Sequence, residues 1–416
     1  MAPALCAQVV FTFFTVVVVL DTTYGARLPE TFTDWTGAFK IVDLDLTGVM
    51  LPQACIQLGA AASGFLGTLI INSVIPLVLV VLACIFCVCK RLARPSASHC
   101  GAMMEGLLAT LPLGLLISFC FVASTSATVF QAFSCIGYKY DANTYHSFLR
   151  ADLSVRCSDA DHVSKEHGAI RTVAWVFVAV WPIGTVFVYL ALLLLCRKAI
   201  LSRTPTRLSR AIRFLTHDYT PECFYWEVLE LVRRTALVGW VLLVPVEQSF
   251  IRLIIALLIS VVFLIALLTM LPYQKVEDNV IAAAAQASCI FIFIGAILTR
   301  LYGEFSDVSQ DGVVTDIMAF DSTEAIAMPL ILVTFGILIL MAGTMVLLLR
   351  KHKSLPHVKL VATLHYPELD FPDACKWHLF LRLVALRWRL PLQSSCDLSS
   401  ICSCVRVGGA SNSALQ

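Results

Sequence analysis

The stretch GFLGTLIINSVIPLVLVVLACIFCVC, residues 64–89, decides the fold class because it holds no charged side chain over 26 residues. A bilayer core is crossed by about 20 apolar residues in a helix, and no other open backbone form satisfies its own hydrogen bonds there. Further apolar runs of crossing length follow along the chain. The sequence therefore predicts an all-α, polytopic membrane helix bundle over residues 64–350 with seven transmembrane helices, at 64–89, 107–131, 169–196, 224–245, 249–271, 280–300 and 325–349.

The composition agrees with a membrane protein. Apolar residues make up 59% of the 416-residue chain and charged residues only 14%, against roughly 25% charged in soluble domains. The formal net charge of +2 is too small to indicate a nucleic-acid partner. Soluble multidomain, disordered and small disulfide-scaffold classes are excluded, and membrane lipid is the expected surrounding.

The N-terminal apolar run, residues 9–20, is short and no Lys or Arg precedes it. Residues 1–20 are interpreted either as a signal peptide or as a first transmembrane helix, and both place 21–63 outside the cell. With the loop after 64–89 inside, the inner segments carry 14 basic residues and the outer ones six. This bias predicts a cytoplasmic tail, 351–416. The plasma membrane is the default location for such a protein.

Motifs for catalysis are missing from the sequence. It has no Gly-rich phosphate loop, no GxSxG, no HExxH and no paired CxxC. We therefore expect no enzyme activity, no cofactor and no metal site. Cys135 and Cys157 bracket the outer loop 134–168 and are a candidate disulfide, which leaves Cys55 over.

The start of the expected span 224–245 breaks the apolar pattern. Charged residues there are costly in a membrane unless they are paired or wetted. Spacing along a helix predicts a pair between Glu230 and Arg234 and a shared face with Glu227. One interpretation is a buried polar face that couples to a gate or path; the other is a tilted helix whose arginines reach the interface. The coupling cluster comprises Glu227, Glu230, Arg233 and Arg234.

The segment between the last two spans is acidic and contains no Lys or Arg from residue 301 to 349. Acidic side chains at an outer mouth concentrate cations. The alternative is an ordinary solvated loop. The residues of this expected cation vestibule are Glu304, Asp307, Asp311, Asp316, Asp321 and Glu324.

In the tail, residues 376–389 (KWHLFLRLVALRWR) mix aromatic, aliphatic and basic side chains. Such a segment is typical of contact with the anionic inner leaflet or with a calmodulin-like partner.

Several strings together resemble a known module. They are, in chain order, FKIVDLDLTGVMLPQAC (39–55), FSCIGYKYD (133–141), FLRADLSVRCSDADH (148–162), WPIGTVFVYL (181–190), YTPECFYWEVLELVRRTALVGWVLLV (219–244) and LLTMLPYQKVEDN (267–279). Over about residues 30–300 they resemble the transmembrane module of the TRP-like (transient-receptor-potential-like) family of algal and protist surface proteins. Those proteins often carry Cys-rich repeats ahead of the module, which this sequence lacks.

The resemblance implies a polytopic helical fold and a cation-channel role. It picks out Cys135, Cys157 and Asp152 in the outer loop, then Trp226, Glu227, Arg233 and Arg234 at the helix entry, and Pro272 and Tyr273 at a span end.

The function expected from the sequence is therefore a homo-oligomeric channel that passes cations, with the last two spans lining the path. The alternative is a seven-span receptor or scaffold that signals through the basic loop 197–213 and the tail. A transporter is less favoured because no internal repeat is visible.

Overall fold

The computed structural model describes residues 2–25, 28–39, 64–93, 99–139, 145–158, 164–245, 248–308 and 324–353. Among them are six helices that are long and apolar enough to cross a membrane. The chain is therefore mostly helical and has the character of an integral membrane protein. Much of segment 21–63 and the tail from residue 354, with 376–389, lie outside the described residues.

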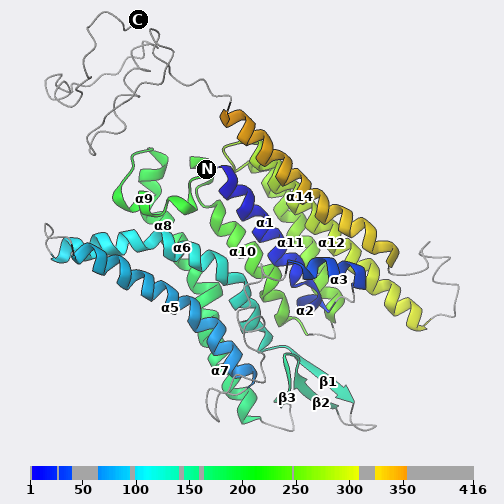
Figure 1. Cartoon of the computed structure of the whole chain (residues 1–416). Helices are drawn as coiled ribbons and strands as arrows, with labels where there is room; N and C mark the ends of the chain where they lie inside the picture. Colours follow the sequence, from blue (N-terminus) through cyan, green and yellow to red (C-terminus); the bar gives the residue numbers. More distant parts are fainter. Residues whose placement is uncertain are drawn as a thin grey trace, which may run out of the picture. The chain divides into compact units, whose positions relative to one another are not determined.

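The helices and strands follow one another along the chain as labelled in Figure 1. Their bounds are α1 (Ala2–Val18), α2 (Leu20–Tyr24), α3 (Glu30–Gly37), α5 (Phe65–Leu92), α6 (His99–Gln131), β1 (Cys135–Lys139), β2 (Tyr145–Leu149), β3 (Asp152–Arg156), α7 (Lys165–Val178), the π-helix η3 (Ala179–Ile183), α8 (Gly184–Leu201), α9 (Arg207–Ala211), the 3-10 helices η4 (Arg213–Leu215) and η5 (Pro221–Cys223), α10 (Trp226–Val238), the 3-10 helix η6 (Trp240–Leu243), α11 (Ser249–Met270), α12 (Val276–Val308) and α14 (Glu324–Lys353).

The N-terminal apolar run forms α1, which packs inside the bundle. Phe14 and Val16 are each 1% exposed, and they share a core with α10, α11, α12 and α14. In Figure 1 this dark blue helix runs beside α10 and α12. Tyr24 then anchors α2, because its hydroxyl donates a 2.6 Å hydrogen bond to the Leu237 carbonyl of α10.

The expected span 224–245 is not confirmed as one long helix. It is divided into α10, of 13 residues, and η6, of four. Gly239 separates the two helices, and Pro245 follows the second. Glycine and proline both disfavour a continuous helix, and the four charges at its start shorten its apolar part further.

The carbonyls at the end of this broken segment are satisfied by Arg252 of α11, whose side chain is fully buried. Its guanidinium donates to Val244 O at 2.8 Å, to Thr23 O at 2.9 Å and to Leu242 O at 3.3 Å. One arginine therefore links α2, η6 and α11 by hydrogen bonds to carbonyls that the helix end leaves unpaired.

The all-α prediction missed a small antiparallel sheet in the loop 134–168. Its strand order is β1-β2-β3, with Cys135 paired to Leu149 and Lys139 to Tyr145. These strands are only five residues long and carry no continuous apolar run, so the long helices dominate the hydropathy pattern. The end of the bundle that carries the sheet is called the sheet end (Figure 1).

Asp152, which the resemblance picks out, joins the sheet to α5. Its Oδ2 accepts the backbone N–H of Phe65 at 3.1 Å, at the first residue of α5, where a negative charge is favoured. Gly64 has a φ of +68°, and a Cβ there would lie 2.6 Å from Asp152 Oδ2. Residue 64 must therefore be glycine for this contact to form.

Candidate functional site

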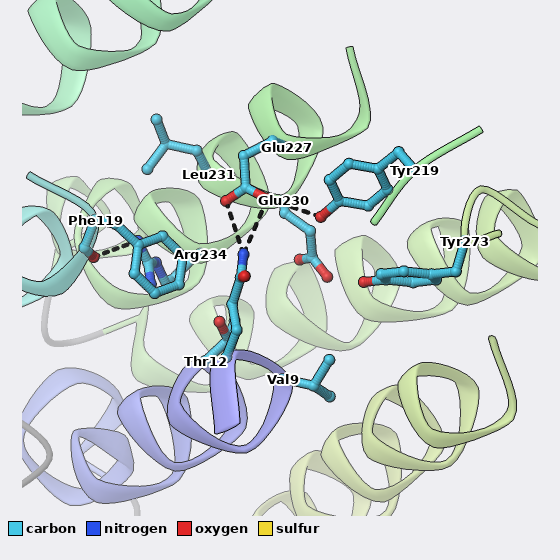
Figure 2. A pocket seen from close by; sticks show the side chains of 10 residues that line it. Val9, Thr12, Phe119, Tyr219, Glu227, Glu230, Leu231, Arg234 and Tyr273 are labelled. Atoms are coloured by element: carbon cyan, nitrogen blue, oxygen red, sulfur yellow. Dashed lines mark hydrogen bonds between the residues drawn. The ribbon is translucent and has the colours of Figure 1, made fainter. Parts of the chain in front are cut away.

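The charged residues at the start of α10 lie inside the bundle. Glu227 and Arg234 are each 1% exposed and Arg233 is 7% exposed, while Glu230 is partly buried. Figure 2 shows Glu227, Glu230 and Arg234 of this cluster between α1 and α10, with Tyr219 and Tyr273 beside them. Both arginines are enclosed by other parts of the chain, which does not fit the alternative in which the arginines of a tilted helix reach the interface. The cluster has two acidic and two basic side chains, so its formal charges balance.

Glu227 is held by two neutral donors, one 219 residues away in the chain and one eight residues before it. The Gln8 side-chain amide of α1 donates to its two carboxylate oxygens at 3.2 and 3.0 Å, and the Tyr219 hydroxyl donates at 2.7 Å. Burial and then the charge of Glu227 raise the pKa of Tyr219 well above its usual range, so this phenol remains a hydrogen-bond donor. Glu227 thus ties α1 to α10.

Glu230 pairs with Arg233 and not, as the spacing predicted, with Arg234. Arg233 donates from Nε and Nη2 to one Glu230 oxygen, at 2.9 and 2.7 Å. Its guanidinium also lies 4.8 Å from the ring centre of Phe263 on α11. Both i,i+3 and i,i+4 partners are within reach on a helix, and here the neighbouring helices select the first.

Arg234 points to α6. Its Nη2 donates to the Phe119 carbonyl at 2.8 Å, and its guanidinium lies 4.2 Å from the centre of the Phe119 ring. Its Nε and Nη1 are buried and have no hydrogen-bond partner among the described residues. Arg234 is therefore a buried contact between α10 and α6.

Two small cavities adjoin the cluster. The first, of about 10 Å³, touches Gln8, Glu227 and Arg234 and reaches Tyr219 and Tyr273. The second, of about 20 Å³, touches Arg233, Phe263, Gln286 and Cys289. Each has room for roughly one or two water molecules. Val9, Thr12 and Glu230 line both.

The segments before α10 and after α11 join beneath the first cavity, at what we call the loop end. Tyr219 and Tyr273 form an isolated antiparallel bridge, and their rings lie 5.1 Å apart. Thr220 N donates to the Pro272 carbonyl at 2.8 Å. Pro272 and Tyr273, which the resemblance selects, therefore lie in the hydrogen-bonded loop end that borders the first cavity. Trp226, also selected, is fully buried against Phe263.

The expected cation vestibule is described only at its two ends. Glu304 forms an ion pair with Arg300 at 2.9 Å, a basic residue that directly precedes the acidic segment. Glu324 accepts a 2.5 Å hydrogen bond from Thr31 of α3. The Asp307 side chain and residues Asp311, Asp316 and Asp321 lie outside the described residues.

Cys135 and Cys157 form a disulfide, with their Cα atoms 6.5 Å apart. It closes the loop that carries all three strands. His167 Nε2 lies 3.7 Å from Cys135 Sγ, so three metal-ligand atoms come together here. The two sulfurs are bonded to each other, and His167 Nδ1 accepts the Ser158 N–H, so the group is a covalent cross-link beside a hydrogen-bonded histidine. Cys55 lies outside the described residues.

Replacing Cys135 with serine is expected to lower the free energy of unfolding by about 2–4 kcal/mol. Without the disulfide, the unfolded chain regains the conformational freedom of the loop that the cross-link closes. Thermal unfolding of the purified full chain, without reductant, measures this. The matched control is Cys89→Ser, a free and exposed thiol on α5, with an expected effect within about 0.5 kcal/mol. Equal stabilities of the two variants would contradict a stabilising cross-link.

The sequence did not identify several residues that contact the cluster or hold the neighbouring helices together. Those that line the first cavity are Gln8, Thr12, Phe119 and Tyr219, and Arg252 links α2, η6 and α11. Gln8 and Arg252 carried a usable signal, since each is an isolated polar residue at the edge of an apolar run. Phe119 carried none, because its backbone carbonyl makes the contact.

Comparison with known proteins finds a partial similarity. The chain is 27% identical over 195 residues to cysteine repeat modular protein A of Toxoplasma gondii, covering 46% of this chain and 6% of that protein. No family model and no solved structure matches. The similarity thus concerns a small part of a much longer protein, and the activity of that protein is not transferred to this chain by it.

Proposed function

We propose that this protein is a cation channel of the TRP-like type. The observation that carries the proposal is the set of four charged side chains on α10, three buried and Glu230 partly buried, among helices long and apolar enough to cross a membrane. Charged groups inside a membrane bundle are expensive to bury, and they are typical of ion pathways and of the elements that gate them. In this proposal the protein is a homo-oligomer of the plasma membrane whose loop end faces the cytoplasm.

The contacts of α10 support its role as the gating element. Tyr219 and Gln8 hold its first turn through Glu227, and Arg234 contacts α6 about two turns further along α10. A shift of the loop end would therefore be transmitted to α1 and α6 together. The cation vestibule would concentrate permeant cations at the outer mouth.

The test is ionic current from the reconstituted full chain compared with the variant Asp316→Asn/Asp321→Asn/Glu324→Gln. Removing three negative charges is expected to reduce cation conductance severalfold at low salt and less at high salt, because salt screens a charged mouth. The control is Glu222→Gln/Glu277→Gln, which neutralises two exposed acids of η5 and α12 at the loop end and is expected to leave the effect of the vestibule on conductance unchanged.

Unchanged current in the vestibule variant would keep the channel and reject the vestibule. Absence of current across the tested voltages, from protein that elutes as a folded species, would contradict the channel. It would favour the second candidate, a receptor or scaffold. That candidate is supported by the small size of the two cavities and the balanced charges of the cluster.

A further inference from the structure

The two cavities follow one another along the same polar wall. Val9 and Thr12 of α1 and Glu230 of α10 line both, so the two spaces share a wall. The first cavity begins at Tyr219 and Tyr273, in the segments of the loop end. The second ends at Cys289, which lies 13 residues into α12, or about 20 Å along its axis.

The wall contains polar groups that require water. Arg234 is 1% exposed, yet two of its N–H-bearing nitrogens, Nε and Nη1, have no partner among the described residues. An unsatisfied buried donor is unfavourable, and buried polar cavities of this size usually hold ordered water. Glu227, Glu230 and the Thr12 hydroxyl provide further hydrogen-bonding oxygen atoms around the same space.

We propose that the two cavities form one hydrated passage, closed at the loop end by Tyr219 and Tyr273, that admits water and small hydrophilic cations as far as Cys289. This places the polar path between α1, α10 and α12. The part that concerns permeating cations rests on the proposed channel function, whereas the passage itself does not.

The packing of α12 on α14 agrees with this location. A Cβ on Gly295 would lie 2.7 Å from Leu330 Cδ2, so the two helices are in close contact there. The sequence predicts that α12 and α14 line the path. The polar groups gather instead around the two cavities beside α10, which supports a path there.

The chain contains a matched pair of native thiols for the test. Cys289 is 3% exposed and lines the second cavity, whereas Cys196 of α8 is 2% exposed and lies in an apolar cluster. The full chain in sealed vesicles, with the loop end accessible, is treated with the small cationic reagent 2-aminoethyl methanethiosulfonate. Labelling at each cysteine is followed by peptide mass spectrometry.

Cys289 is expected to react and Cys196 to remain unmodified over the same time. Tyr273→Ala removes one of the two tyrosines that close the passage. It is expected to speed labelling of Cys289 about tenfold, equivalent to about 1.4 kcal/mol, and to leave the labelling rate of Cys196 unchanged. Thr12→Leu, which fills the shared wall, is expected to slow it by a similar factor. Elution and thermal stability are measured for each variant to confirm folding.

Equal labelling of Cys289 and Cys196 in the parent, or an unchanged Cys289 rate in folded Tyr273→Ala and Thr12→Leu, would overturn the passage. The labelling needs no ionic current. Labelling of Cys289 without current would support the passage and contradict the channel. Current without labelling of Cys289 would support the channel and overturn the passage.

Discussion

Replacing Arg252 with leucine is expected to lower the free energy of unfolding by about 3–5 kcal/mol. The leucine leaves the carbonyls of Thr23, Leu242 and Val244 without their donor in a buried site. The chain is broken there between η6 and α11, so its carbonyls have no regular helical partner.

The measurement is the thermal transition of the detergent-solubilised full chain, followed by fluorescence-detected size-exclusion chromatography. Arg252→Lys is expected to recover only part of the loss, because an ammonium group lacks the planar fork that reaches several carbonyls. Arg210→Leu, an exposed arginine of α9, is the control, with an expected effect within about 0.5 kcal/mol. A transition in Arg252→Leu equal to that of the control would show that these hydrogen bonds contribute little.

Replacing Arg234 with methionine is expected to destabilise the fold by about 3–5 kcal/mol, and Glu227→Gln in the same chain is expected to restore at least half of the loss. Methionine keeps the packing on Phe119 but leaves the coupling cluster of α10 with one excess negative charge. The glutamine removes that charge and keeps a hydrogen-bonding group opposite Gln8 and Tyr219.

A double-mutant cycle measures this coupling from the thermal stabilities of the parent, the two single variants and the double variant. A coupling energy of about 2–3 kcal/mol is expected if the cluster is stabilised as one balanced group. Strict additivity of the two single effects would mean that Glu227 and Arg234 act independently, and that α10 does not connect α1 to α6 through its charges.

The prediction of the helices from the sequence succeeded where the bilayer sets the length. The stretch 64–89 is apolar over its whole length, so a crossing helix is its only stable form in lipid, and α5 confirms it. The stretch 224–245 is apolar on average as well, but hydropathy does not register that Gly239 divides it and that Pro245 ends it. The strands were missed because five-residue segments outside the membrane carry little hydropathy signal.

The sequence by itself determined that the chain is a bundle of apolar helices, that Cys135 and Cys157 are able to join and that Glu227, Glu230, Arg233 and Arg234 are out of place in an apolar run. Only the tertiary structure decided their partners. Helical spacing permits Glu230 to reach either arginine; Phe263 on α11 and the Phe119 carbonyl on α6 direct Arg233 to Glu230 and Arg234 away from it. Gln8 is 219 residues from Glu227 in the chain, and a contact of that range arises only when α1 packs into the core. Local pattern thus specifies which residues must be buried or paired, whereas the choice of partner depends on which helices meet.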